Sequence, residues 1–383
     1  RARFEAAGRV GPRHAAPGEA HLLGAERWHN LPAPLASFIG RGREVADVRG
    51  LLGARRLVTL TGPGGVGKTR LAFQVAADAL DGFPDGLCFV SLAPIADPEL
   101  VLPALAQALG VRETPDRSLM ETLVGVLRAK HLLLLLDNFE QVLAAASRVG
   151  EVLAACPKLA VLVTSRAPLH LYGEQEYSVP PLALPDPREA PSPERLGQVE
   201  AVALFVERAR GVRPDFALTA ETAPVVAEIC RRLDGLPLAV ELAAVRVHLL
   251  PPPALLARLE RRLPLLIGGP RDAPARQHTL RATIDWSYDL LGEPERALFR
   301  RLGVFVGGCT LEAAETVCNA HGDLSVDVLD GVAELVDKSL LRQQETEDGD
   351  PRLIMLETIR EYALGQLTAA EAETLRRTHA AHY

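Results

Sequence analysis

The sequence predicts three folded units in a row: an α/β domain built on a parallel five-stranded sheet, an all-α helical domain, and a winged-helix domain. Three observations indicate this order. Short apolar strands alternate with helical segments between residues 56 and 180. The strands stop at the proline-rich stretch "PPLALPDPREAPSPE". Near the end, several helices precede two short strands around "EDGDP", which is typical of a winged helix.

The strands of the first domain are expected to be buried on both faces. The stretch "HLLLLL" is apolar without alternation, as in a parallel sheet covered by helices on both sides. The expected strands are 56–60, 87–92, 131–136, 159–165 and 176–180. The expected helices, identified by apolar spacing with a period of 3.6, are 68–80, 98–110, 118–129 and 140–156. Further helices are expected at about 196–210, 220–233, 237–249 and 253–262.

Composition and pattern set the expected domain boundaries. The N-terminal stretch is rich in Arg, Ala, Gly, Pro and His and lacks periodicity, which favours a disordered linker. The expected units are a linker at 1–30, the α/β domain at 31–190, the helical domain at 191–274, the winged-helix domain at 275–367 and the start of a further helical region at 368–383. Because the chain begins at Arg1 without Met, we expect it to be a piece of a longer protein.

Bulk composition argues against several classes of protein. The net charge of −7 disfavours broad nonspecific binding to nucleic acid. The five cysteines show no CxxC spacing, which disfavours a zinc site or a disulfide framework and favours a reduced, cytoplasmic protein. No uncharged apolar run approaches the ~18 residues of a membrane span, and no signal peptide is present. We therefore expect no membrane partner.

A phosphate-binding loop is predicted between the first strand and the first helix. "GPGGVGKT" fits the pattern G-x-x-x-x-G-K-[ST], and the required strand and helix flank it. Its glycines allow backbone N–H groups to face phosphate oxygens, and the helix adds its positive end. Lys68 is expected to reach the β- and γ-phosphates of ATP, and Thr69 to bind Mg²⁺. The expected nucleotide-binding residues here are Gly62, Pro63, Gly64, Gly65, Val66, Gly67, Lys68, Thr69 and Arg70. A glycine-rich turn without a ligand is the alternative.

Asp137 is expected to complete the metal site. It ends the leucine strand, about 70 residues after the loop and one strand later, where P-loop nucleotidases place the aspartate that holds Mg²⁺. A buried strand with a capping aspartate is the alternative. The predicted cofactors are therefore ATP or ADP with Mg²⁺, and the predicted metal ligands are Thr69 and Asp137.

Several motifs in order resemble a known family. They are "NLPAPLASFIGR", "LTGPGGVGKTRLA", "LLLLLDNFE", "VLVTSR", "CRRLDGLPLAVELAA", "TLRATIDWSYDLL" and "MLETIREYA". Together, over about residues 30 to 365, they resemble the NB-ARC core of bacterial STAND regulators, including transcriptional regulators of the SARP and LuxR types. The resemblance implies an AAA+-like P-loop ATPase fold, and effector and sensor domains that flank this region.

The resemblance also implies roles for residues outside the loop. Ile39 and Arg41, in "FIGR", would lie near the adenine and ribose; a loop packed on the sheet edge, with Arg41 a surface charge, is the alternative. Arg166, in "TSR", would be a sensor of the γ-phosphate; a surface arginine at a strand end is the alternative. Pro237 would touch the adenine, and it also suits the first turn of a helix.

This sequence departs from the family pattern at two positions. The wider family often has a second acid after the metal aspartate, whereas position 138 is Asn, which can orient a water but cannot take its proton. We interpret Glu140 as an acid at a helix N-terminus, with replacement of the missing base as the alternative. Leu356 occupies the place of a histidine that contacts the ADP β-phosphate, so that contact is excluded. The expected catalytic positions are Asp137, Asn138 and Arg166.

Three functions compete: a nucleotide switch that self-associates with ATP bound, an ATPase whose turnover is the output, and a DNA reader using the winged helix. Residues 275–361 hold nine Lys and Arg against seventeen Asp and Glu. Phosphate contacts depend on Lys and Arg, so this part of the chain is expected to bind no DNA directly. No further catalytic constellation is evident. The sequence therefore favours a switch with slow ATP hydrolysis.

Overall fold

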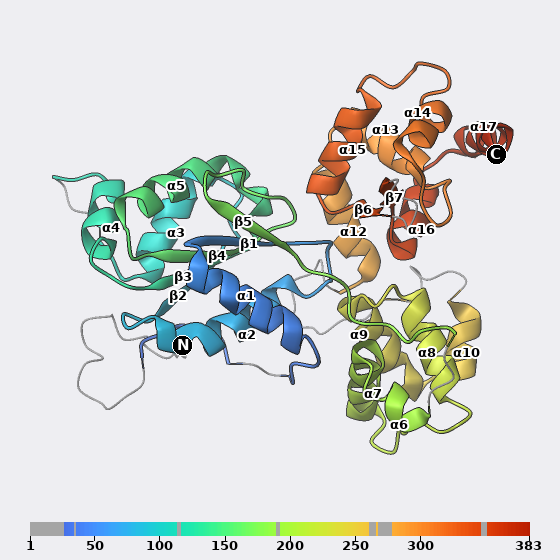
Figure 1. Cartoon of the computed structure of the whole chain (residues 1–383), viewed down its shortest axis with the longest axis horizontal. Coiled ribbons are helices and arrows are strands. Elements are labelled where there is room, and N and C mark those ends of the chain that lie inside the picture. Colours follow the sequence, from blue (N-terminus) through green and yellow to red (C-terminus); the bar gives the residue numbers. More distant parts are fainter. Residues whose placement is uncertain are drawn as a thin grey trace, which may run out of the picture.

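A three-layer α/β domain occupies the N-terminal half of the chain (Figure 1). The structure is a computed structural model, and it describes residues 27–33, 36–112, 116–188, 192–259, 266, 278–345 and 351–383. Its strands are β1 (Leu57–Thr61), β2 (Leu87–Ser91), β3 (Leu133–Asp137), β4 (Ala160–Thr164) and β5 (Glu174–Ser178). All pairings are parallel, in the order β2-β3-β4-β1-β5. The predicted parallel five-stranded sheet is confirmed.

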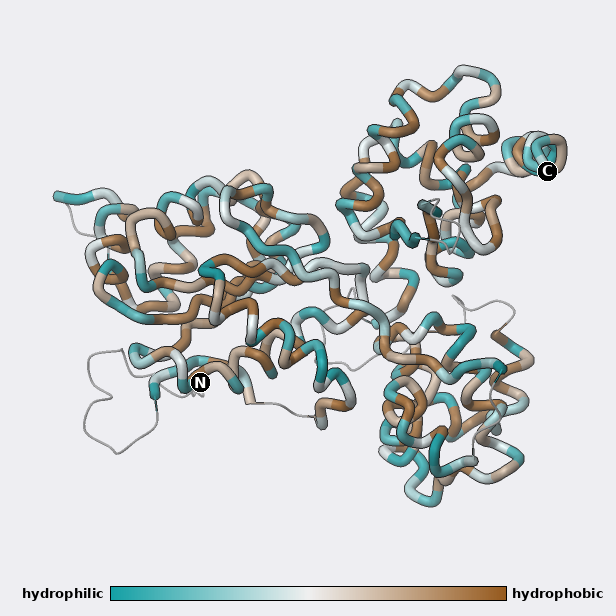
Figure 2. Tube along the Cα trace, in the orientation of Figure 1, coloured by the Kyte–Doolittle hydropathy of each residue, from teal (hydrophilic) through white to brown (hydrophobic). Residues whose placement is uncertain are grey.

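Helices cover both faces of the sheet. On one face lie α1 (Gly42–Ala54) and α2 (Lys68–Ala79); on the other lie α3 (Val101–Ala108), α4 (Leu119–Leu127) and α5 (Ala146–Ala155) (Figure 1). Successive leucines of β3 point to opposite faces of the sheet. Leu133 and Leu135 belong to the same apolar cluster as α1 and α2, whereas Leu134 and Leu136 belong to the cluster of α3, α4 and α5. Each buried leucine contributes about 1.5–3 kcal/mol, which explains why the leucine run of β3 is apolar without alternation. Figure 2 shows hydrophobic residues gathered within the sheet, whereas the edge strand β5 is polar and only partly buried.

The helix predicted at 140–156 begins later than expected. Asn138 has a left-handed backbone with φ of 65°, and two 3₁₀ turns follow at Phe139–Gln141 and Leu143–Ala145 before α5 begins. Phe139 and Glu140 are buried in the first of these turns. Asparagine tolerates the left-handed region better than most residues, so the chain can turn inward directly after β3.

The helical domain follows β5 and the proline-rich segment. Its helices are α6 (Pro193–Leu196), α7 (Glu200–Val212), α8 (Ala223–Arg232), α9 (Pro237–Val245) and α10 (Pro252–Arg258). Proline begins α9 and α10, where a missing N–H costs nothing. The predicted end of the last helix, beyond residue 259, lies outside the described residues.

The winged-helix domain closes the chain. It contains α12 (Leu280–Asp289), α13 (Glu293–Leu302), α14 (Leu311–Cys318), α15 (Val328–Asp337), the antiparallel strands β6 (Arg342–Glu345) and β7 (Pro351–Ile354), and α16 (Glu357–Gly365). This confirms the predicted helices followed by a hairpin, although the turn at 346–350 lies outside the described residues. The last helix, α17 (Ala369–His382), is capped by Thr368 and Glu371.

The last four residues of the predicted linker pack against the α/β domain. Residues 1–26 lie outside the described residues, whereas 27–30 lie along β2. Leu87 N donates to the Trp28 carbonyl at 2.9 Å, and the Asn30 side chain pairs with both backbone groups of Phe89. These hydrogen bonds make residues 27–30 part of the sheet edge. None of the described helices is long and apolar enough to cross a membrane.

Candidate nucleotide site

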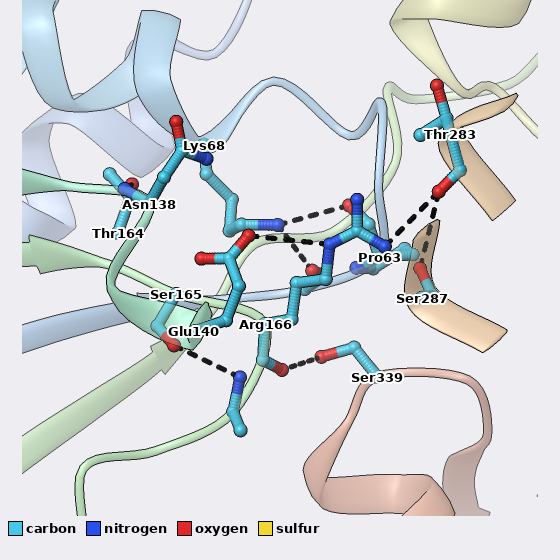
Figure 3. Close-up of polar contacts among 12 residues, drawn as sticks. Pro63, Lys68, Asn138, Glu140, Thr164, Ser165, Arg166, Thr283, Ser287 and Ser339 are labelled. Carbon is cyan, nitrogen blue, oxygen red and sulfur yellow. Dashed lines mark hydrogen bonds and ion pairs between the residues drawn. The ribbon is translucent and has the colours of Figure 1, made fainter. Parts of the chain in front are cut away.

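The glycine-rich loop joins β1 to α2 as the sequence predicts. Gly67 caps α2 with φ of 94°, a conformation that residues with a side chain rarely adopt. The Lys68 Nζ donates to the carbonyls of Gly62 and Pro63, at 2.5 and 3.2 Å (Figure 3). The buried ammonium therefore lies inside the loop, where a phosphate would be a stronger partner than neutral carbonyls.

Asp137 and Thr69 come together at the end of the sheet. Although β4 separates β3 from β1, Thr69 Oγ1 donates to Asp137 Oδ1 at 2.7 Å. Thr164, at the end of β4, donates to the same oxygen at 2.5 Å. A hydroxyl and a buried carboxylate are hard oxygen ligands, which fit Mg²⁺. The sequence analysis did not single out Thr164, because its role depends on the strand order.

Arg166 is buried at the contact with the winged-helix domain. Its Nη1 donates to the Thr283 carbonyl at 3.2 Å, and its guanidinium lies 4.2 Å from the centre of the Trp286 ring. The Arg166 carbonyl accepts from Ser339 Oγ at 2.7 Å (Figure 3). Arg166 is thus no surface arginine: α12 and the segment after α15 enclose it.

Glu140 faces Arg166 from the turn after β3. Its Oε1 lies 3.4 Å from Arg166 Nε, and the Glu140 side chain is 2% exposed. The other oxygen, Oε2, has no hydrogen-bond partner among the described residues. Glu140 lies in a 3₁₀ turn six residues before α5 begins, so our interpretation of it as a helix N-terminal acid is wrong.

A cavity of about 130 Å³ unites most of the predicted site residues. Its lining includes Gly64, Gly65, Gly67, Lys68, Thr69, Arg70, Asn138, Glu140, Arg166, Pro237 and Thr283. A methyl group placed on Gly64 would come within 2.4 Å of Thr283 Cγ2, so α12 lies directly on the loop. We call this arrangement, with α12 covering the loop and Arg166, the docked form. The cavity is smaller than the ~300–1,000 Å³ of typical ligand pockets.

Ile39, Arg41 and Pro237 line an adjoining cavity of about 30 Å³. Arg41 is buried, and its Nη2 donates to the carbonyls of Val66 and Pro180, at 2.6 and 3.0 Å. Burial lowers the pKa of Arg41, which Glu44 and Glu200 partly oppose. The alternative of a surface charge therefore does not hold for Arg41, whose Nη1 lacks a hydrogen-bond partner within the described part of the chain.

Sequence comparison identifies two domains and several relatives. Residues 46–168 match the NB-ARC domain, and residues 291–368 match a winged helix-turn-helix domain. An uncharacterized protein of Mycobacterium tuberculosis is 42% identical over 357 residues, covering 92% of this chain and 87% of that protein. A candidate HTH-type transcriptional regulator of the same species is 44% identical over 338 residues, covering 88% of this chain. Regulatory protein AfsR of Streptomyces coelicolor is 32% identical over 340 residues, covering 81%.

The two regulators are much longer than this chain. The chain spans 36% of the length of the candidate regulator and 31% of AfsR. Among solved structures, a Walker-type ATPase of Pyrococcus abyssi superposes with a TM-score of 0.55 at 11% identity, covering 86% of this chain and 96% of that one. That likeness shows the fold. The chain belongs to the NB-ARC (STAND-type) P-loop ATPases that carry a C-terminal winged helix-turn-helix domain, the family that includes AfsR-type bacterial regulators.

Proposed function

We propose that this module is a nucleotide-operated switch within a larger regulator, with ATP or ADP controlling whether the winged-helix domain is docked. The observation that carries the proposal is the contact of α12 with the nucleotide loop. Thr283 lies on Gly64, and Arg166, the expected γ-phosphate sensor, is held by groups of the winged-helix domain. A triphosphate that attracts Arg166 competes with docking, because the same guanidinium cannot bind the γ-phosphate and the α12 groups at once.

The residues around the loop fit Mg²⁺ and a nucleotide. Lys68 and the backbone of the loop would hold the phosphates, Thr69 and Asp137 would hold Mg²⁺, and Arg41 and Pro237 would border the base and ribose. When bound, Mg²⁺ neutralises charge on the phosphate oxygens. The small cavity of the docked form supports a switch, since a triphosphate needs more room than about 130 Å³.

The switch proposal extends to the whole regulator. Opening of the docked form would expose the face of α12 that now covers the loop, and we propose that this permits self-association with ATP bound. Transcriptional regulation is proposed because relatives are named as regulators. A cytoplasmic location is consistent with the five free, buried cysteines.

DNA binding through the winged helix is the second candidate function, favoured by the match to a winged helix-turn-helix domain. Its charges oppose it: α15 carries Asp330, Glu334 and Asp337 and no basic residue. The end of α15 also faces the nucleotide domain, where Asp337 lies 3.5 Å from His170. Titration of the whole chain with random duplex at low salt should show no binding. Submicromolar affinity that falls steeply with salt would favour the second candidate.

The test of the proposed function is nucleotide binding by the wild type and Lys68→Ala, measured by calorimetry. Charge-assisted hydrogen bonds contribute about 1.5–3 kcal/mol, so Lys68→Ala should weaken ATP binding at least about tenfold. Lys158→Ala, a change at an exposed lysine, is the matched control. Unchanged affinity in a folded Lys68→Ala protein would exclude the loop as the phosphate site.

A further inference from the structure

Two groups beside the loop, the buried Glu140 and the half-buried Trp286, have no role in nucleotide binding as proposed above. Glu140 lines the cavity with Lys68 and Asn138, and its Oε2 has no hydrogen-bond partner among the described residues. Trp286, on α12, stacks on the guanidinium of Arg166. Figure 3 shows Glu140 and Arg166 facing each other between the loop and α12. An unpartnered carboxylate oxygen in a buried cavity costs free energy, which favours a functional reason for it.

We propose that Glu140 is the general base of ATP hydrolysis and that Arg166, fixed by α12, restrains it in the docked form. This inference rests on the proposed function, because it requires ATP at the loop. Asn138 follows the metal aspartate but cannot accept a proton. Glu140 is the carboxylate that lines the cavity from the same turn, and it can.

The proposed step balances as follows. The oxygen of a water bonds to the γ-phosphorus while Glu140 Oε2 accepts one of its protons. The bond between the γ-phosphorus and the β–γ bridging oxygen breaks, and ADP leaves with that electron pair. Glu140 then returns the proton to phosphate or solvent, which restores the carboxylate.

The restraint comes from the partners of Arg166. Its ion pair holds Glu140 Oε1 at 3.4 Å, while the Thr283 carbonyl and the Trp286 ring hold the guanidinium from the other side. Ser339 holds the Arg166 backbone. Three of these four contacts come from the winged-helix domain. Undocking removes them together, which frees Arg166 and, with it, the carboxylate of Glu140.

The first measurement compares wild type, Glu140→Gln and Glu151→Gln. Glu151 is an exposed residue of α5, so its variant is the matched control. ATP binding, measured with a fluorescent analogue, should be similar in all three. Single-turnover phosphate release should fall about 100-fold or more in Glu140→Gln alone, since a general base contributes roughly 10²–10⁴. Release at the wild-type rate by a Glu140→Gln protein that binds ATP would overturn the assignment of the base.

The second measurement removes the restraint. Trp286→Leu should raise phosphate release about tenfold, because the cation–π contact no longer holds Arg166. Tyr172→Leu, at a fully exposed tyrosine, should change nothing. If wild type hydrolyses too slowly to measure, Trp286→Leu should hydrolyse and the Trp286→Leu, Glu140→Gln double variant should not. An equal rate in wild type and Trp286→Leu, or no hydrolysis in either despite ATP binding, would overturn the proposal.

A third measurement needs no nucleotide. Trp28 and Trp286 are the two tryptophans of the chain, so Trp28→Phe leaves Trp286 as the single fluorophore. In that background, Arg166→Gln should increase acrylamide quenching of Trp286, because the guanidinium no longer covers the ring. Unchanged quenching would exclude the restraint by α12. A wild-type protein that binds no ATP would instead overturn the proposed function itself, so the two failures are distinguishable.

Discussion

The two halves of the candidate site are built in different ways. The metal half, with Thr69, Asp137 and Thr164, comes entirely from strands and a helix of one domain. The sensor half places Arg166 and Glu140 against Thr283 and a tryptophan of another domain. The metal half therefore survives any movement between domains, whereas the sensor half exists only in the docked form. The proposed metal ligands can therefore stay together in both forms, whereas the proposed hydrolysis requires undocking.

A second contact holds the winged-helix domain, this time on the helical domain. Asp234 Oδ2 accepts from both the backbone N and Oγ1 of Thr358, each at 2.9 Å. Thr358 is fully buried and directly follows Glu357 of the "MLE" motif. The motif that lacks the family histidine thus lies beside a docking contact made by protein groups alone. This contact between the winged-helix and helical domains therefore needs no nucleotide, unlike the contact that the family histidine makes with ADP.

The largest expected effect is at the metal half. Asp137→Ala removes the strand-end carboxylate, so Mg²⁺ should no longer strengthen ATP binding. The affinity for ATP with Mg²⁺ should fall by more than about tenfold, and hydrolysis should stop. Calorimetry with Mg²⁺ and with EDTA separates the metal term from the rest. The matched control is Asp78→Ala, at an exposed residue of α2. Equal affinity with and without Mg²⁺ in wild type would contradict the assignment of Asp137.

A smaller effect is expected at the second docking contact. Asp234→Gly removes the carboxylate without straining a backbone whose φ is 56°, and leaves two donors of Thr358 without this acceptor. Unsatisfied buried donors cost about 1–3 kcal/mol, so docking should weaken by that amount. Limited proteolysis between the domains should become faster. Asp234→Asn keeps an acceptor and should behave like wild type; equal loss in both variants would show that the charge, not the hydrogen bonds, matters.

A still smaller effect is expected at Asn138. If Glu140 is the base, Asn138→Asp should change single-turnover hydrolysis by less than about tenfold, or 1.4 kcal/mol in the barrier. The left-handed backbone at this position accepts Asp as well as Asn. Phosphate release in a single turnover measures this. A larger acceleration would mean that position 138 faces the attacking water.

Local pattern explains most of what the sequence predicted. The strands, the loop glycines, Lys68 and Asp137 follow from apolar runs and fixed spacings over a few residues. The features that the sequence did not predict depend on contacts between residues far apart in the chain or on the backbone conformation of one residue. The stacking of Arg166 on Trp286 joins residues 120 positions apart, and no local rule links them. The burial of Glu140 depends on one left-handed residue, Asn138, which shifts the start of α5 by six residues.

The smallest expected effect is an unchanged rate of cysteine alkylation with ADP and ATP. This comparison tests whether the domains undock as rigid bodies. Burial raises the pKa of the thiols of Cys88 and Cys230 to about 12 and of Cys309 to about 11. At pH 8 these thiols are almost fully protonated and inert. If the domains separate without unfolding, alkylation by iodoacetamide should be equally slow with ADP and ATP, whereas all five cysteines should react in guanidinium. Mass spectrometry of each peptide measures this.

The same thiols fix the sign of one pH dependence. Their pKa values are raised in the folded protein, so they stabilise it fully below about pH 8.5, the unfolded value, and this contribution is lost as pH rises toward 11 or 12. Thermal unfolding should therefore shift to lower temperature between pH 9 and 11, with or without nucleotide.

In the alkylation experiment, faster reaction of Cys309 with ATP than with ADP would mean that the winged-helix domain loosens internally when it undocks. The sensor half would then be lost through local unfolding instead of movement of an intact domain.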